Sequence, residues 1–352
     1  MKTLLKILAS ASAALVTLPA SHSLAQPSET ELERQASQAR SIERIQRDYA
    51  SRTDDTASAR SLARGPRIIN GRPIANDAKN WEWTVSIQRR NNHSCGGALI
   101  SPGYTASGKG VVWRDDDTEP VWVVTAAHCI TELELNLIKR GELTAVSGDV
   151  SLARRDEFGK NRRLDSQKVI AAYLHPDYDP KTNANDIALL QLEELENPVS
   201  NRRRSIGIAQ DTQQSWLYAP YTSLNVMGWG TTLEGGFLSE TLQQVRVPFV
   251  EQAQCAGSYA SASNMGMSAG MICAGFSSGG YDSCQGDSGG PLAYIPAPGV
   301  PSPTRSAVLA GVVSWGSGCA RPNLFGVYTS ALAYRGWMAR TIRQAETRDT
   351  NN

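Results

Sequence analysis

Short stretches of β-forming residues recur along most of this chain, and they limit its fold more than any other feature of the sequence. From Ile68 onward, runs rich in apolar and β-branched residues are separated by clusters of Gly, Pro and Asn. Several runs alternate apolar with polar residues, as half-buried antiparallel strands do. Many short strands at this spacing favour a barrel or a sandwich. The clearest runs are Thr84–Gln88, Val121–Thr125, Ile187–Leu192, Gln243–Val250 and Ala307–Val313.

One segment near the end of the chain has the pattern of a helix. Residues 331–342 carry apolar side chains at helical spacing, which predicts an amphipathic helix. The residues that follow, 346–352, are polar, and we expect them to be frayed. The sequence therefore predicts an all-β domain that ends in a single helix.

The start of the chain differs from the rest in composition. Lysines precede an apolar stretch at about residues 7–18, and small residues follow it, which is the pattern of a secretory signal peptide at residues 1–25. The apolar stretch is too short and too rich in small residues for a membrane anchor. Residues 26–67 are polar and cannot bury much surface, so we assign them to a propeptide ahead of a folded domain at 68–352.

The cysteines fit an exported protein. There are six, an even number that suits disulfide pairing in an oxidising compartment. None of them has the close CxxC spacing of a structural zinc site, so we expect disulfides and no metal. Spacing alone does not choose among the pairings that six cysteines allow. The cysteines are Cys95, Cys129, Cys255, Cys273, Cys284 and Cys319.

The charge of the chain excludes some classes of partner. Lys and Arg total 35 against 34 for Asp and Glu, which leaves a formal charge of +1. This balance gives no reason to expect nucleic acid as a partner. No stretch after the signal peptide is apolar enough to cross a bilayer, so we expect a mature protein away from the membrane. It would be secreted to the periplasm or to the extracellular space.

The strongest sign of chemistry is the run GDSGGP, residues 286–291. Glycines beside Ser288 allow a sharp turn, and the N–H groups of Gly286 and Ser288 could then form an oxyanion hole. Because a serine alone is a weak nucleophile, it needs a base. His128 follows an apolar run and is the best candidate for that base. Asp186 opens another apolar run and could orient the imidazole.

The other histidines are weaker candidates. His22 lies in the predicted signal peptide. His93 lies among polar residues, and we expect it to be a solvated turn residue. His175 precedes a proline and is expected to have a surface or structural role.

With these motifs in this order, the chain resembles the trypsin/chymotrypsin family of serine proteases. The runs TAAHC, NDIALL and GDSGGP follow one another as the His, Asp and Ser motifs of that family do. The shorter runs CGG, GWG, SWG and GVY match further landmarks of the family. The resemblance covers residues 68–342. It implies two packed antiparallel β-barrels at roughly 68–200 and 201–330, followed by the helix at 331–342.

The resemblance also implies a role for each candidate residue. Ser288 would attack the scissile carbonyl, His128 would transfer the proton, and Asp186 would hold the imidazole tautomer. The reaction would be peptide-bond hydrolysis through an acyl-enzyme. The implied disulfides are Cys95–Cys129, Cys255–Cys273 and Cys284–Cys319.

Specificity is implied by Asp282, which matches the base of the family's main substrate pocket. A carboxylate there favours Arg or Lys in the substrate. The alternative is that Asp282 is an exposed loop aspartate. Gly316 and Gly326 match pocket walls without side chains. Ser314, Trp315 and Gly316 match a strand edge that would pair with the substrate backbone.

Activation is implied at the junction of Arg67 and Ile68. In the family, cleavage at this place frees an Ile amine that pairs with the aspartate before the catalytic serine, here Asp287. The encoded chain would therefore be a zymogen. Arg67 suits the proposed pocket, so self-activation and another activating protease both remain open.

The remaining expectations concern ligands, partners and rival functions. No cofactor is implied. Calcium is left open but disfavoured, because residues 147–163 offer no convincing set of oxygen ligands. The loops 101–120 and 295–303 are long for the family, and solvated variable loops are favoured over protein-binding sites. Expected partners are protein or peptide substrates, an activating protease and protein inhibitors, with the mature protein a monomer.

Two rival functions are weighed against the protease. A catalytically inactive binding protein on the same scaffold is disfavoured by the intact His, Asp and Ser. An esterase of another fold would have its serine in a different motif and the triad in a different chain order.

Overall fold

The computed structural model describes residues 71–75, 80–104, 111–114, 121–154, 160, 164–194, 203–260, 266–297, 302, 304 and 306–349. These residues belong to one compact unit. The predicted signal peptide, the propeptide at 26–67 and the Arg67–Ile68 junction lie outside the described residues, as do most of the loops 101–120 and 295–303.

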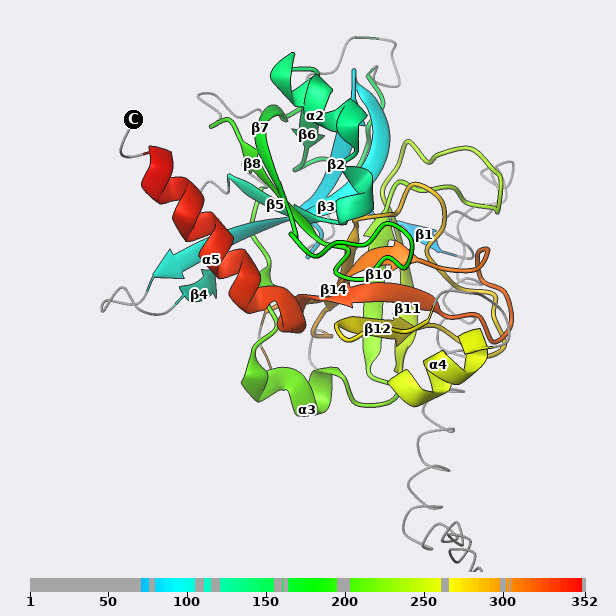
Figure 1. The fold of residues 1–352 in the computed structure, drawn as a ribbon. Helices are drawn as coiled ribbons and strands as arrows, with labels where there is room; N and C mark the ends of the chain where they lie inside the picture. The colour runs from blue at the N-terminus through cyan, green and yellow to red at the C-terminus, as the bar shows by residue number, and fades with distance from the viewer. Residues whose placement is uncertain are drawn as a thin grey trace, which may run out of the picture. The chain divides into compact units, whose positions relative to one another are not determined.

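Six antiparallel strands close into a first barrel (Figure 1). Neighbouring strands follow the order β2-β6-β7-β8-β5-β3, and pairing between β3 and β2 closes the ring. A further strand, β4, extends the hairpin at the end of β3. The strands are β2 (Thr84–Arg89), β3 (Asn92–Tyr104), β4 (Val111–Arg114), β5 (Trp122–Thr125), β6 (Leu143–Val146), β7 (Ser166–Leu174) and β8 (Ala188–Leu192).

A second barrel is built in the same way. Its strands follow the order β11-β10-β13-β14-β15-β12, and pairing between β12 and β11 closes the ring. Two short strands, β1 and β9, add to its edges. The strands are β1 (Arg72–Pro73), β9 (Gly207–Ile208), β10 (Ser223–Gly228), β11 (Gln243–Val250), β12 (Met271–Ala274), β13 (Pro291–Tyr294), β14 (Val308–Trp315) and β15 (Gly326–Ser330). Two closed barrels confirm the all-β fold expected from the sequence.

The start of the domain corrects the expected barrel boundary. β1 pairs with β11 of the second barrel, although residues 68–200 were assigned to the first. The physical reason is an open strand edge. β12 pairs only with the far end of β11, at Phe249 and Val250. The near end of β11 therefore has free backbone groups, and β1 satisfies them.

Helical segments connect and cover the barrels. They are η1 (Ala127–Cys129), α2 (Glu132–Lys139), η2 (Asp211–Gln213), α3 (Gln214–Leu217), α4 (Gln252–Ala260) and α5 (Ala331–Asp349). Among the described residues, no helix combines the length and the apolar character that a membrane crossing requires.

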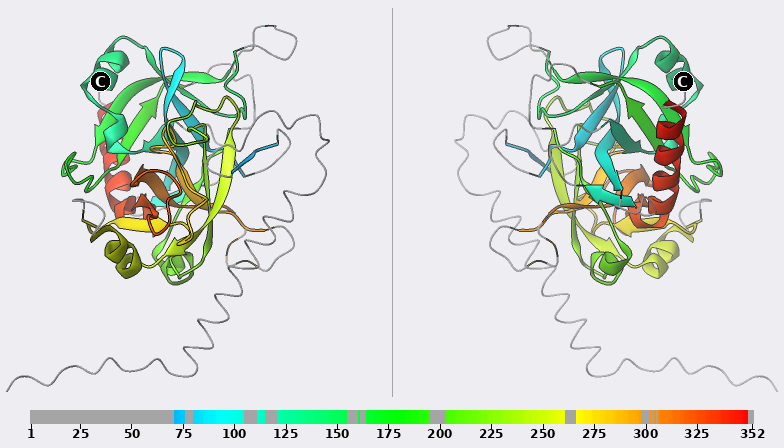
Figure 2. Two further views of the ribbon diagram at one scale, coloured as in Figure 1. Left: turned by 90° about the vertical axis from the view of Figure 1, so that its right-hand side faces the viewer. Right: turned by 90° about the vertical axis from the view of Figure 1, so that its left-hand side faces the viewer.

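The C-terminal helix is longer than the sequence predicted. α5 continues to Asp349, past the predicted end at residue 342 and through part of the tail expected to be frayed. Its buried side chains Ala331, Tyr334, Met338, Ile342 and Ala345 form one stripe at helical spacing. Because this stripe packs into the shared core, the last turns gain contacts that their polar composition does not reveal. In Figure 2 the helix lies lengthwise against the barrels.

Alternation along the strands explains how each barrel fills its interior. In β7, Gln167 and Val169 are buried, whereas the intervening Lys168 and Ile170 are exposed. This is the period-two pattern of a sheet with one face on a core. β2 is buried along most of its length because neighbouring structure covers both of its faces.

The barrels approach each other closely at two glycines. A Cβ atom on Gly96 of β3 would lie 2.7 Å from the Cα of Gly290, which precedes β13. Real Cβ contacts are not that short, so the two backbones can meet only because Gly96 has no side chain. At the same place the Gly96 N–H donates to the Ser288 carbonyl at 2.7 Å. The loop that carries Ser288 is therefore anchored on the first barrel.

Candidate active site

A carboxylate and an imidazole form a hydrogen-bonded pair beside the Ser288 loop. Asp186 precedes β8 and has no exposed surface, and its Oδ2 lies 2.8 Å from Nδ1 of His128 in η1. Its Oδ1 accepts the backbone N–H of His128 at 2.9 Å. Because an ionised carboxylate can only accept, Nδ1 carries the proton in this pair. The other ring nitrogen, Nε2, is then free to act as a base.

The second barrel also holds Asp186. The Ser314 hydroxyl, at the end of β14, donates to its Oδ2 at 2.5 Å. The Thr329 hydroxyl, on β15, donates to its backbone carbonyl at 2.8 Å. A buried charge is tolerated when hydrogen bonds replace the water it has lost. Here those bonds come from both barrels, so the position of the carboxylate depends on how the barrels are packed.

Ser288 lies in a loop whose backbone is fixed on both sides. Gly286 and Gly289 have φ values of +93° and +78°, which side chains rarely allow. The Gly289 N–H donates to the Val313 carbonyl at 2.8 Å, and the Val313 N–H returns a bond to Gly290 at 2.9 Å. Among the described residues, no hydrogen bond joins the Ser288 hydroxyl to the His128 ring. Such catalytic contacts are often long until substrate binds.

The backbone around Ser288 offers two free donors. Within the part of the chain that the structure describes, neither the Gly286 N–H nor the Ser288 N–H donates a hydrogen bond. The Thr231 N–H donates to the Gln285 carbonyl at 2.6 Å and so orients the peptide that contains the Gly286 N–H. Two free donors near a nucleophile are what an oxyanion hole requires.

His93 corrects an expectation from the sequence. It is half-buried rather than a solvated turn residue, and its ring lies between two partners. Nε2 is 2.9 Å from the Gly286 carbonyl and Nδ1 is 2.8 Å from the Ser86 hydroxyl. Burial lowers the pKa of His93 to about 4, so the ring is neutral near pH 7. The polar residues around His93 in the sequence gave no sign that it contacts Gly286, the glycine of the candidate oxyanion hole.

Asp287 is fully buried beside Ser288. Its Oδ1 accepts the Gly230 N–H and its Oδ2 accepts the Cys284 N–H, each at 2.9 Å. A Cβ atom on Gly228 would lie 2.2 Å from Oδ1, so this glycine leaves room for the carboxylate. Burial raises the pKa of Asp287 to about 7, against the effect of the two N–H donors. Its expected partner Ile68, and Arg67, lie outside the described residues.

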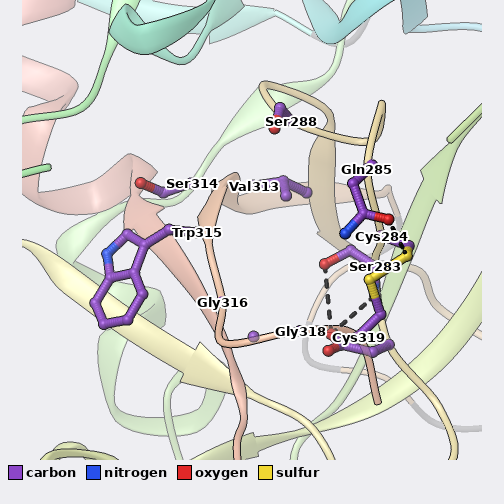
Figure 3. A pocket seen from close by; sticks show the side chains of 12 residues that line it. Ser283, Cys284, Gln285, Ser288, Val313, Ser314, Trp315, Gly316, Gly318 and Cys319 are labelled. Atoms are coloured by element: carbon purple, nitrogen blue, oxygen red, sulfur yellow. Dashed lines mark hydrogen bonds between the residues drawn. A yellow bond between two sulfur atoms is a disulfide. The ribbon is translucent and has the colours of Figure 1, made fainter. Parts of the chain in front are cut away.

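A pocket of about 210 Å³ opens beside Ser288 (Figure 3). Asp282 lines it and is 4% exposed. Its Oδ1 accepts the Ser283 N–H at 2.8 Å and its Oδ2 accepts the Ala320 N–H at 3.0 Å. Burial raises the pKa of Asp282 to about 7, and these hydrogen bonds lower it in part.

The walls of the pocket include the other residues that the sequence predicted for substrate binding. Figure 3 shows the chain from Val313 to Gly316 on one side and Ser283 to Gln285 on the other. A Cβ atom on Gly326 would lie 2.9 Å from Oδ1 of Asp282, so a side chain there would crowd the carboxylate. The lining residues predicted for substrate binding are Asp282, Ser314, Trp315, Gly316 and Gly326. Ser288, Cys284 and Cys319, predicted for other roles, also line the pocket, and those not predicted for the site are Ser283, Gln285, Val313 and Gly318.

Two of the three disulfides lie at the site. The three bonds join Cys95 to Cys129, Cys255 to Cys273 and Cys284 to Cys319, the pairs that the family resemblance implies. The first lies beside His128 and the third lies in the pocket wall. Among the described residues, Cys95, Cys129 and His128 also form the one cluster with metal-ligand spacing. Because both sulfurs are in a disulfide, they cannot supply the thiolates that such a metal would need.

Comparison with known proteins identifies the family. A family model described as Trypsin matches residues 117–338. "Serine protease 56" of Homo sapiens is 30% identical over 283 residues, which cover 80% of this chain and 40% of that protein. "Serine protease 56" of Mus musculus is 31% identical over 272 residues, covering 77% of this chain and 38% of that protein. The chain thus spans less than half the length of these relatives.

The geometry predicts the effect of changing Asp186 to Asn. An amide at this position can donate to Nδ1 of His128, which would favour the wrong tautomer and remove the base near Ser288. We expect Asp186→Asn to slow the labelling of Ser288 by a fluorophosphonate by about 10³- to 10⁴-fold. Mass spectrometry of the labelled peptide measures the rate. Asp211→Asn, an exposed aspartate in η2, is the matched control and should label at the unchanged rate. Equal labelling of both variants would contradict the assignment.

Proposed function

The chain belongs to the trypsin family of serine proteases, and on that premise we propose that it is a secreted endopeptidase that cleaves after Arg or Lys. The observation that carries the specificity is Asp282, a buried carboxylate in the pocket beside Ser288. No basic side chain among the described residues forms an ion pair with it. A guanidinium or ammonium group of a substrate would supply the missing countercharge.

The proposed reaction follows from the arrangement of the site. Oγ of Ser288 attacks the carbonyl carbon of the scissile bond while Nε2 of His128 takes its proton. The negative oxygen of the tetrahedral intermediate accepts the N–H groups of Gly286 and Ser288. His128 then passes the proton to the leaving amine, and an acyl-enzyme remains on Ser288. Water repeats the sequence and releases the acid. Asp186 stabilises the imidazolium at both stages.

The chain is also proposed to be a zymogen that is cleaved between Arg67 and Ile68 after export. Asp287 supports this proposal because its buried carboxylate has two N–H partners and a pKa of about 7. A newly freed amine next to it would favour the charged carboxylate and hold the Ser288 loop in its active form. The predicted signal peptide at residues 1–25 supports export.

Specificity is tested with Asp282→Ser. Removing one partner of a buried charge pair costs about 3–5 kcal/mol. At about tenfold per 1.4 kcal/mol, kcat/KM for cleavage after Arg or Lys should fall on the order of a hundredfold to a few thousandfold. A peptide library analysed at both sides of each cut measures the effect. Asp211→Ser is the control and should keep the wild-type preference. An unchanged preference in Asp282→Ser would refute the proposed pocket.

The pocket predicts a pH dependence for cation binding. Because the pKa of Asp282 is raised to about 7, the empty pocket becomes protonated, and so neutral, as the pH falls below 7. The affinity for benzamidine should therefore be constant at alkaline pH and decrease by up to about tenfold per pH unit below 7. Inhibition constants from pH 5 to 9 measure this. In Asp282→Ser the affinity should be weak and nearly flat. A flat profile in the wild type would count against the raised pKa.

Activation is tested by limited cleavage of the full chain. Cleavage after Arg67 should release an N-terminus at Ile68 and increase turnover of an Arg anilide, since the amine would then reach Asp287. Arg67→Gln should prevent both changes. Asp287→Asn should permit the cleavage but abolish most of the gain in turnover. N-terminal sequencing and steady-state rates give the readouts. Equal turnover before and after cleavage would exclude the zymogen proposal.

A further inference from the structure

Asn185, the residue before Asp186, has a backbone conformation that side chains rarely adopt. Its φ is +55°, in the left-handed region that favours glycine. Asparagine tolerates this region better than most residues because its short side chain forms local hydrogen bonds. Strained backbone of this kind persists only where surrounding contacts hold it, and it is concentrated at functional sites. The contacts that hold Asn185 therefore also set the position of Asp186.

One of these contacts comes from the C-terminal helix. The hydroxyl of Tyr334, near the start of α5 (Figure 1), donates to Oδ1 of Asn185 at 2.8 Å. The two residues are 149 positions apart in the sequence. Tyr334 is 7% exposed, so solvent has little access to this hydrogen bond. The hydroxyl thus joins the helix to the backbone that carries Asp186.

The Asn185 side chain also closes the loop that leads to Asp186. Its Nδ2 donates to the Asp177 carbonyl at 2.8 Å. The backbone carbonyl of Asn185 accepts the Ile187 N–H at 2.8 Å, and the Ile187 carbonyl accepts the His175 N–H at 3.0 Å. The side chain therefore donates toward the loop and accepts from the helix, and the residues on both sides of Asp186 are fixed.

Tyr334 is itself packed on more than one side. Its ring meets the ring of His175 edge-on, with the centroids 5.3 Å apart. A Cβ atom on Gly270 would lie 2.6 Å from the Tyr334 hydroxyl, so a side chain there would displace it. Burial raises the pKa of Tyr334, and the negative charge of Asp186 raises it further. The hydroxyl therefore keeps its proton at neutral pH and remains a donor to Asn185.

These contacts assign a role in catalysis to a residue outside the reacting centre. We propose that Tyr334 is a positioning residue for the proposed reaction. Through Asn185 it fixes the backbone that directs Asp186 toward the imidazole of His128. Ser314 and His128 orient the carboxylate itself, whereas Tyr334 fixes the residue before it. This inference rests on the proposed function and makes the docking of α5 a condition for full activity.

Removal of the hydroxyl alone tests the inference. Tyr334→Phe keeps the ring and its packing but loses the bond to Asn185. In the activated enzyme, kcat for an Arg anilide should fall about 10-fold, since displacing a catalytic group by about 1 Å can cost about 100-fold. KM should stay within about twofold, because Tyr334 does not line the substrate pocket. Steady-state rates and the labelling of Ser288 by a fluorophosphonate measure the change.

A matched control removes a similar hydrogen bond elsewhere. The Tyr218 hydroxyl donates to the Ala310 carbonyl at 2.8 Å, the same length as the bond of Tyr334. Tyr218→Phe should lower the melting temperature about as much as Tyr334→Phe does, but leave kcat within about twofold of the wild type. All rates are measured well below both melting temperatures. Equal losses of kcat in the two variants would assign the effect of Tyr334 to stability alone and overturn the inference.

A double-mutant cycle shows whether Tyr334 acts through Asn185. In Asn185→Ala the acceptor is absent, so adding Tyr334→Phe should change kcat by less than about twofold. Asn185→Gly, which adopts a positive φ without strain, takes the place of Asn185→Ala if that variant folds poorly. The inference is refuted if the two losses multiply or if Tyr334→Phe keeps the wild-type kcat. Failure of the proposed function is distinguishable, because then the activated wild type does not hydrolyse the anilide at all.

Discussion

The geometry of the site depends on the hydrogen bonds that the buried carboxylate of Asp186 accepts. This residue belongs to the first barrel, yet the hydroxyl of Ser314 from the second barrel donates to its carboxylate at 2.5 Å. His128 supplies two further bonds from the first barrel. Burying a charge costs free energy unless hydrogen-bond donors surround it. Because the donors to Asp186 come from both barrels, they favour one relative position of the barrels. Because Gly96 has no side chain, the two backbones can come close enough for that position.

Two other carboxylates of the serine loop are buried and held by backbone N–H groups. Asp282 and Asp287 lie on either side of Cys284, and burial raises the pKa of each to about 7. Each carboxylate accepts two backbone N–H groups, which position it without neutralising it. A cation that reaches either group would gain a charge-assisted bond in a dry environment. The loop therefore contains two places suited to positive charge, one open to the pocket and one closed.

Two surfaces near Ser288 differ in character. The pocket side offers one buried charge and glycine walls, whereas the 231–238 hairpin offers exposed apolar surface. The two are joined by Glu234 and Arg321, and both contact the peptide that contains Gln285 and Gly286.

The sequence by itself determined the fold class and the local motifs, because strand alternation and glycine-rich turns depend only on residues that are close in the sequence. The expected strand Gln243–Val250 is β11 itself, and the three cysteine pairs follow the family pattern. The tertiary structure decided what depends on distant segments. It placed the half-buried His93 against Gly286, paired β1 with the second barrel and extended α5 to Asp349. These outcomes depend on which strand edges and apolar surfaces the closed barrels leave uncovered. Hydrogen bonds and burial between segments distant in the sequence determine what covers them.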